Sequence, residues 1–442
     1  MLQAGFARVD ITPPLGVSVQ GYYEERLADG ILDPLYATAV AFDDGERRAV
    51  VMSVDVIGIH QYLAEELRTM IAEAVGTVKE AVFLCCTHTH LAPGITAGND
   101  LLENDDYVNF LFRRKLRDAA VLALGDLAPT TMAYTRGKVR DVAFVRRFRM
   151  QDGTAMTNPG WQNPEVLHPL DTPDEDSSLL ILRRENAPEI GIVNFQVHPD
   201  VIGGCSLSAD FPKFVRDTYE TLIPNSRCMY INGAEGDTNH IDIRLGEGQC
   251  RGGYSRAKYM GRKIAMSVLA DYELAEPLVG EKIRFCQLHV PARHHKGSPA
   301  QQEDALRIAR IYREQGAEAA FPHLSGMART AALAEAVRIE MLLNCPEEKE
   351  LFVTALAVGD LVFAGFPGEP FTEVGRQVKA GSPFTLTVPA CCANGYEDYY
   401  PTRSAYAEGG YEAASALFVA GTAETLIAAS LDAVNTLYDL GG

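Results

Sequence analysis

The sequence lacks the cysteine spacings of a disulfide-stabilised or zinc-finger protein. It holds nine cysteines in 442 residues, an odd number, and no CxxC pair. Four of them form the adjacent pairs Cys85-Cys86 and Cys391-Cys392. This spacing fits neither a disulfide framework nor a structural zinc site, so we expect reduced, mostly buried thiols. A metal in this protein would have to be held mainly by histidine and carboxylate.

Positively charged residues are also fewer than negatively charged ones. The chain has 40 Lys and Arg against 59 Asp and Glu, which gives a net charge of -19. A protein that binds nucleic acid needs clustered Lys and Arg to neutralise phosphates, so this balance argues against a nucleic-acid partner. Hydrophobic residues make up 47% and charged residues 22%, as in an ordinary globular protein of enzyme size.

Long apolar segments are missing too. No stretch approaches about eighteen uninterrupted apolar residues, so we expect no membrane span and see no membrane anchor. The first residues do not pair a basic start with an apolar region, as a signal peptide would. On these grounds we expect a cytoplasmic protein.

Segments with strand and helix patterns alternate along the chain. Strands are expected at 36–42, 49–56, 81–86, 179–182, 190–197, 227–231 and 283–290, with a hairpin over 351–366. Helices are expected at 61–75, 106–123, 211–222, 257–274, 300–315, 327–343 and 413–435. The predicted fold is α/β, with mixed β-sheets flanked by helices and a metal site at strand ends on one edge. We expect a single domain over 1–442, with a helical insertion at about 300–344.

One long segment, 137–178, is rich in Asn, Pro and Asp and has little periodicity. Long irregular loops inside a compact domain are uncommon unless they carry function. We therefore expect this segment to line or cover the site.

Candidate ligands follow three apolar strands at the point where each strand ends. Thr87-His88-Thr89-His90 follows the run from Ala81 to Cys86, and residues i and i+2 of a strand share a face. His198 follows a second strand and is itself followed by Pro199, which stops further pairing. Glu369 follows a third strand across a Pro-Gly turn.

These features also have simpler explanations. The two histidines of the first motif could be polar loop residues without a partner. Glu369 could complement the dipole of a following helix. Taken together, however, two His and one carboxylate form a typical catalytic zinc set that leaves a position open for water. The same donors could also hold manganese or iron.

The order of several motifs resembles that of the neutral/alkaline (non-lysosomal) ceramidases, and in particular their short bacterial relatives without the C-terminal immunoglobulin-like domain. The matching segments run along nearly the whole chain: Asp10-Ile11-Thr12-Pro13, Asp33-Pro34-Leu35-Tyr36-Ala37, Thr87-His88-Thr89-His90, Asn194-Phe195 with His198-Pro199, Pro367-Gly368-Glu369, and Asn394 to Tyr406.

The resemblance implies a zinc amidase with about one zinc per chain. It assigns the metal to His88, His198, Glu369 and Tyr399, and it gives His90 the task of stabilising an oxyanion or moving a proton. The choice of tyrosine stays open because three others are nearby: Tyr396, Tyr400 and Tyr406.

One segment departs from the family pattern. Where the family has GDVSPN, this chain reads Gly236-Asp237-Thr238-Asn239-His240. Asn239 occupies the place of a serine that is often considered essential, and an amide cannot act as an acyl-accepting nucleophile. Thr238 is shifted by one residue and would point elsewhere in an extended segment. His240 is an additional pocket candidate, or else a capping or surface histidine.

The mechanism that we expect is attack by metal-activated water, since zinc lowers the pKa of bound water to about 7. His90 and Tyr399 would stabilise the oxyanion. Arg146 and Arg147 would bind a carboxylate or polar head of the substrate, or else be exposed arginines. Candidates for orienting the histidines, which could instead be turn or cap aspartates, are Asp10, Asp55, Asp200 and Asp237.

The expected substrate is a small soluble amide rather than ceramide, because the family serine is absent. An ester or lactone is the second choice. The competing class is a catalytically degenerate homologue that binds metal and ligand without hydrolysing anything.

Overall fold

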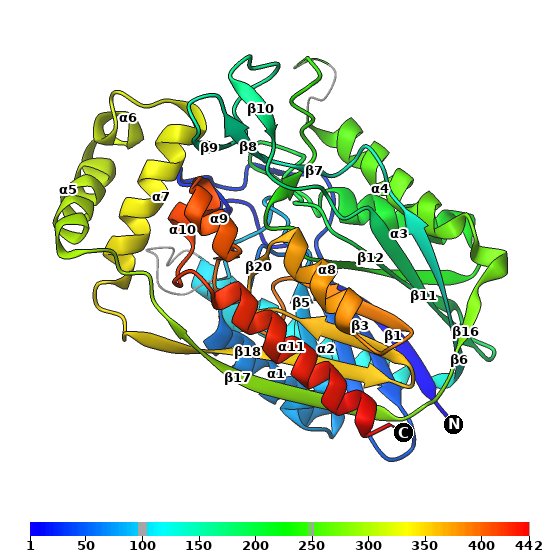
Figure 1. Cartoon of the computed structure of the whole chain (residues 1–442). Helices are drawn as coiled ribbons and strands as arrows, with labels where there is room; N and C mark the ends of the chain where they lie inside the picture. Colours follow the sequence, from blue (N-terminus) through cyan, green and yellow to red (C-terminus); the bar gives the residue numbers. More distant parts are fainter. Residues whose placement is uncertain (96–103, 247, 249–251, 442) are drawn as a thin grey trace.

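The computed structural model describes residues 1–95, 104–246, 248 and 252–441, and its elements form layers (Figure 1). Two large β-sheets face each other, and helices cover the outer face of each sheet. The predicted class, mixed sheets flanked by helices, is confirmed.

The larger sheet has nine strands. In spatial order they are β14 (Ser226–Asn232), β12 (Glu189–Phe195), β11 (Asp176–Arg184), β6 (Ala128–Lys138), β1 (Gln3–Asp10), β3 (Tyr36–Asp43), β4 (Arg48–Val54) and β5 (Val82–Cys86), with β16 (Glu276–Leu278) beside β6. Pairing is antiparallel except near the edges, where β4 and β5 run parallel, as do β12 and β14.

The smaller sheet has four strands, in the order β17 (Ile283–Arg293), β18 (Glu348–Val358), β19 (Leu361–Gly365) and β21 (Leu386–Ala390). A continuous apolar core fills the space between the two sheets. Phe83 of β5 meets Phe363 of β19 there, with ring centroids 5.8 Å apart. Strands such as β5 are apolar on both faces because helices cover the other side of the sheet.

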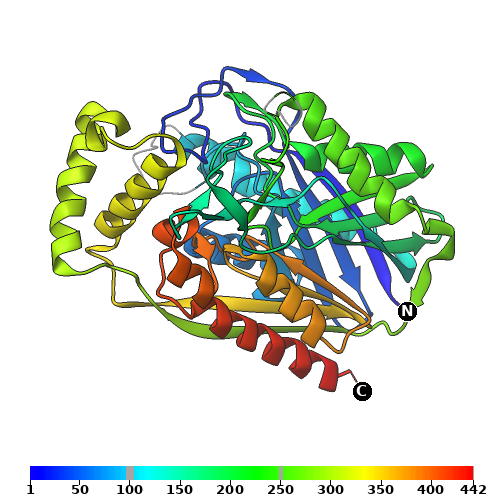
Figure 2. The same cartoon turned by 45° about the horizontal axis from the view of Figure 1, so that its top comes forward.

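The helices pack in three groups. The larger sheet is covered by α1 (Gln61–Val75) and α2 (Arg113–Gly125) on one half, and by α3 (Phe211–Leu222) and α4 (Tyr254–Leu269) on the other. The smaller sheet is covered by α8 (Thr372–Gly381) and α11 (Thr422–Asp439). In Figure 2, α11 (red) and the pair α3 and α4 (green) lie on opposite sides of the sheets.

A third group of helices projects to one side (Figure 1). It comprises α5 (Pro299–Gln315), α6 (Ala317–Ala320) and α7 (Gly326–Leu342), and it lies in the chain between β17 and β18, which pair with each other. The short helix α10 (Tyr411–Ser415), which follows α9 (Arg403–Glu408), connects this group to the main body, since Arg338 of α7 donates to the carbonyl of Ala414 at 2.8 Å.

The larger sheet curves so that its edge strands β5 and β14 approach each other. Ser53 of β4 donates to the Tyr230 carbonyl of β14 at 2.6 Å, and the Asn232 side chain donates to the Thr87 carbonyl at 3.3 Å. The parallel pair β19 and β21 meets this edge, since the Asn194 side chain donates to the Pro389 carbonyl at 3.1 Å. The carboxyl ends of β4, β5, β12, β14, β19 and β21 therefore converge at one place.

Several element predictions were wrong. The segment 137–178 is not one long loop: it contains β7 (Phe144–Val145), which pairs with β15 (Thr238–Asn239), and a three-stranded sheet of β10 (Val166–Pro169), β8 (Arg147–Met150) and β9 (Ala155–Thr157). The strands are too short to show an alternating pattern. The expected helix at 413–435 is interrupted by the break between α10 and α11, whereas the one at 106–123 forms and begins with a π-helical stretch (Tyr107–Phe112) that runs into α2.

In the part of the chain that the structure describes, no helix is long and apolar enough to cross a membrane. Eight of the nine cysteines lie there, and all eight are free thiols. Cys250 lies outside the described residues.

Candidate metal centre

The first two histidines follow β5 and are held in a strained turn. The strand ends at Cys86, and His88 has a φ of 69°, a conformation that costs a non-glycine residue about 1–3 kcal/mol. Strand alternation was therefore the wrong reason to place His88 beside His90, although the two rings do lie 5.1 Å apart. The Nδ1 of His88 lies 2.7 Å from the Ile57 carbonyl, which leaves Nε2 as the free ligand atom.

The third histidine, His198, follows β12. Its Nε2 lies 3.3 Å from the Nε2 of His88 and 3.0 Å from that of His90. Its other ring nitrogen, Nδ1, lies 2.7 Å from Oε2 of Glu235, in the loop after β14. Sequence reasoning missed Glu235, although β12 and β14 are parallel neighbours whose carboxyl ends meet at one edge.

The carboxylate of Glu369 completes the group. It lies in β20 (Glu369–Pro370), which pairs with β22 (Tyr399–Tyr400). Its Oε2 is 3.3 Å from Nε2 of His88 and 3.8 Å from Nε2 of His198, and it has no hydrogen-bond partner. Nε2 of His88, Nε2 of His198 and Oε2 of Glu369 thus face the same point, and Nε2 of His90 lies beside that of His198. Among the described residues, His88, His198, Glu235 and Glu369 have ligand atoms close enough to hold a metal ion, and so do the three histidines.

Burial and mutual charge set the protonation of these groups. Burial lowers the pKa of the His88 imidazole, but Glu369 and Glu235 outweigh burial and raise it above its ordinary value. Burial raises the pKa of Glu369, but His88 outweighs it and holds the pKa low. For Glu235 burial prevails, and its pKa is raised. Burial and neighbouring cations lower the pKa of both His90 and His198.

The two carboxylates of the site lack a permanent cation. Glu235 is 0% exposed and Glu369 is 1% exposed. Among the described residues, neither pairs with Lys or Arg, and both Glu235 oxygens are without a hydrogen-bond partner. Buried carboxylates are costly unless they are paired or coordinate a metal. A divalent cation between the histidines would neutralise both charges, so the residues present fit a metal ion.

Tyrosines from the segment 391–400 form one side of the candidate metal centre. Two hydrogen bonds fix this segment on β5: the Asn394 amide donates to the Leu84 carbonyl, and the Leu84 amide donates to Asn394 Oδ1. Tyr396 donates its hydroxyl to Oε1 of Glu369 at 2.8 Å. The predicted ligand Tyr399 instead accepts from Arg146 at 3.0 Å, and its ring stacks on His198 with centroids 6.5 Å apart.

Arg146 is buried and committed to protein partners. Besides Tyr399, it donates to Glu412 Oε1 at 2.7 Å and to the Gly236 carbonyl at 2.8 Å. Arg147 is also buried and donates to the carbonyls of Ala405 and Gly409. The alternative that these are exposed arginines is therefore wrong.

The segment that departs from the family motif lies beside the site. Asn239 is buried in β15; its side chain donates to Asn158 and accepts from the Ile241 amide, not from a site histidine. Thr238 donates its hydroxyl to the Glu235 carbonyl. His240 is buried, and burial lowers its pKa to about 4.

None of the four aspartates expected to orient the histidines accepts a hydrogen bond from one, within the part of the chain that the structure describes. Asp55 pairs with Arg216. Asp237 accepts from Thr372 at the start of α8. Asp200 accepts from the Tyr22 hydroxyl, and Asp10 accepts from the Thr12 amide.

The side of the candidate metal centre next to His90 is polar and closely packed. The ring of Tyr22 lies 5.7 Å from the His90 ring, and Arg26 stacks over Tyr22 while donating to the His90 carbonyl at 2.8 Å. Gly21 approaches so closely that a Cβ there would lie 2.4 Å from Nδ1 of His90.

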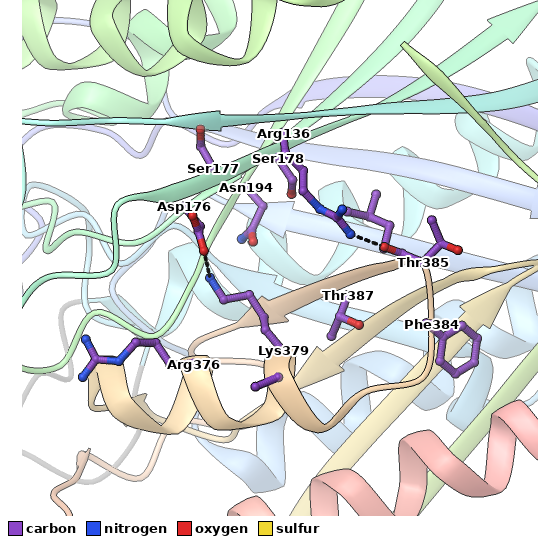
Figure 3. A pocket seen from close by; sticks show the side chains of 12 residues that line it. Arg136, Asp176, Ser177, Ser178, Asn194, Arg376, Lys379, Phe384, Thr385 and Thr387 are labelled. Atoms are coloured by element: carbon purple, nitrogen blue, oxygen red, sulfur yellow. Dashed lines mark hydrogen bonds and ion pairs between the residues drawn. The ribbon is translucent and has the colours of Figure 1, made fainter.

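A cavity of about 460 Å³ lies elsewhere, between β11 and α8 (Figure 3). Its charged groups largely satisfy one another: Lys379 pairs with Asp174 and Asp176, and Arg376 pairs with Asp171 and Glu373. Its lining residues include none of the three histidines, so the cavity is separate from the candidate metal centre.

Two solved structures of ceramidases have the same architecture as this chain. The crystal structure of neutral ceramidase from Pseudomonas aeruginosa superposes with a TM-score of 0.74 and 18% identity, over 99% of this chain and 75% of that one. A structure described as ceramidase complexed with C2 gives 0.72 and 19%, with the same coverage. The fold is the neutral ceramidase fold. The resemblance drawn from the motifs is thus confirmed at the level of the fold. Neither a family model nor a curated protein matches the sequence.

Proposed function

We propose that this ceramidase-like protein is a zinc-dependent hydrolase that cleaves an amide (C–N) bond. The observation that carries the proposal is the convergence of the Nε2 atoms of His88 and His198 on Oε2 of Glu369, a buried oxygen with no other partner. Two His and one carboxylate form a typical catalytic zinc set.

The metal would be held by His88, His198 and Glu369. When bound, zinc supplies Lewis acidity and makes water a nucleophile near neutral pH. His90 then serves as a further nitrogen ligand or as the group that stabilises an oxyanion, because its Nε2 lies 3.0 Å from Nε2 of His198. Tyr399, which is fixed by Arg146, offers a second hydroxyl beside His198.

We further propose that the substrate is a small polar amide rather than ceramide. Two features support this choice. The place of the family serine is taken by Asn239, whose amide is already hydrogen-bonded to Asn158 and Ile241. The side of the candidate metal centre next to His90 is polar, with the Tyr22 hydroxyl donating to Asp200.

Metal content and hydrolysis test the proposal together. We expect about one zinc per chain in protein purified without chelator, and its loss in His88→Ala and Glu369→Ala, as measured by elemental analysis. His168→Ala is the matched control, because His168 is an exposed histidine in β10. The zinc-loaded protein should hydrolyse members of a panel of small N-acyl amides and lose this activity on chelation.

Two results would contradict the proposal. Absence of stoichiometric metal in the native protein would indicate a degenerate homologue. Hydrolysis of esters or lactones without any amide turnover, or preference for a short-chain ceramide in the same panel, would leave the metal site intact but show that the substrate class is wrong.

A further inference from the structure

Glu235 lies behind His198, on the opposite side of the imidazole from the metal-facing nitrogen. Its Oε2 is 2.7 Å from Nδ1, whereas Nε2 of the same ring faces His88, His90 and Glu369. A carboxylate on the Nδ1 side is placed to orient the ring rather than to bind the ion that Nε2 binds.

We infer that Glu235 is a positioning residue of the metal centre: its carboxylate holds His198 with Nε2 toward the metal and adds negative charge that strengthens binding of a divalent cation. This inference rests on the proposed function, because it needs a metal at Nε2. It does not depend on which bond is hydrolysed.

Two further observations support this role. First, the carboxylate is fully buried, and within the described part of the chain neither of its oxygens is committed to another hydrogen bond, so a slight turn of His198 on ligation would align its 2.7 Å contact with Oε2. Second, the thiols of Cys391 and Cys392 lie against this carboxylate, and no Lys or Arg pairs with it among the described residues. A negative charge on Glu235 would therefore act mainly on the histidines and on a metal ion bound between them.

The backbone of Glu235 offers a competing explanation for the orientation of the His198 ring. The backbone carbonyl of Glu235 also faces the His198 imidazole and could orient it without the side chain. His88 shows this arrangement, since its Nδ1 is 2.7 Å from the Ile57 carbonyl. Side-chain variants separate the two explanations because they leave the carbonyl in place.

The test compares zinc affinity, measured by competition with a chromophoric chelator, in the native protein, Glu235→Ala and Glu235→Gln. We expect Glu235→Ala to bind zinc about 10–100-fold more weakly, the usual effect of losing such a partner. Glu235→Gln should fall between the native protein and Glu235→Ala, because its amide oxygen still accepts from Nδ1 while the charge is gone. Cobalt in place of zinc should show an altered visible spectrum in Glu235→Ala.

The control is Asp33→Asn, which alters another buried carboxylate whose partners are Ser208 and Ala209 rather than an imidazole. It should lower thermal stability and leave zinc affinity and the cobalt spectrum unchanged. The inference fails if both Glu235 variants bind zinc within about threefold of native while His198→Ala does not bind, or if Asp33→Asn loses as much affinity. Should Glu235→Ala not fold, Glu235→Gln alone decides. A native protein without metal would instead overturn the proposed function.

Discussion

At the scale of single residues, two neighbouring tyrosines have different hydrogen-bond partners. The motif resemblance assigns the metal to Tyr399, which accepts a hydrogen bond from Arg146. Tyr396 is the tyrosine whose hydroxyl reaches Glu369, at Oε1, and this bond leaves Oε2 directed at His88. These contacts lead us to propose that Tyr396 fixes the carboxylate of Glu369 for metal binding, and that Tyr399 is left to act on a substrate.

This division predicts different losses in two matched variants. Tyr396→Phe should weaken zinc binding by about tenfold or more, because an unanchored carboxylate loses its orientation. Tyr399→Phe should keep zinc affinity within about threefold and lower kcat. Chelator competition and steady-state kinetics on the zinc-loaded proteins measure both quantities. The reverse pattern, with affinity lost only in Tyr399→Phe, would show that the tyrosine assigned by resemblance is the ligand.

At the scale of elements, the sequence predicts strands whose pattern is local and misses those that depend on partners. Strands β4 and β5 are nearly continuous apolar runs, so their positions can be predicted from the sequence. The central strand β1 reads QAGFARVD and has no such run; it is a strand because all eight of its residues pair with β3. No periodicity in β1 could have revealed a partner some thirty residues away.

The site shows the same division. The sequence places His88, His198 and Glu369 at strand ends, because a ligand type after an apolar run is a local signal. The docking of Asn394 on Leu84, which positions Tyr396, joins residues that no spacing rule connects. Glu235 differs, since the rule that carboxyl ends of parallel strands meet would have found it once β12 and β14 were paired.

The attachment of α7 to α10 offers a test at this scale. Arg338 is 2% exposed and donates to the carbonyls of Ala414 and His295. Arg338→Ala leaves these partly buried carbonyls unpaired and should lower the free energy of unfolding by about 1–3 kcal/mol in urea denaturation. Arg310→Ala, an exposed arginine in α5, should stay within about 0.5 kcal/mol of native. Equal effects of the two substitutions would mean that the helical group is not anchored through Arg338.

At the scale of the whole molecule, metal binding and folding should be coupled. The donors come from the ends of β5 and β12 and from β20, which the fold alone brings together. In the metal-free protein, Glu235 is fully buried without a Lys or Arg partner among the described residues, and because burial raises the pKa of its carboxyl group, its charged form destabilises the native state. A cation that binds only the native state relieves this cost and adds its own binding free energy.

Zinc should therefore stabilise the native protein by roughly 4 kcal/mol when its free concentration is 1,000 times the dissociation constant. The measurement is urea denaturation of chelator-treated protein with and without added zinc. Glu369→Gln, which keeps the volume of the side chain and removes its charge, should gain much less. Weak binding of zinc to Cys and His in the unfolded chain lowers the gain in both proteins, so the difference between them is the quantity to compare. Equal gains would place the stabilising zinc outside the centre formed by His88, His198 and Glu369.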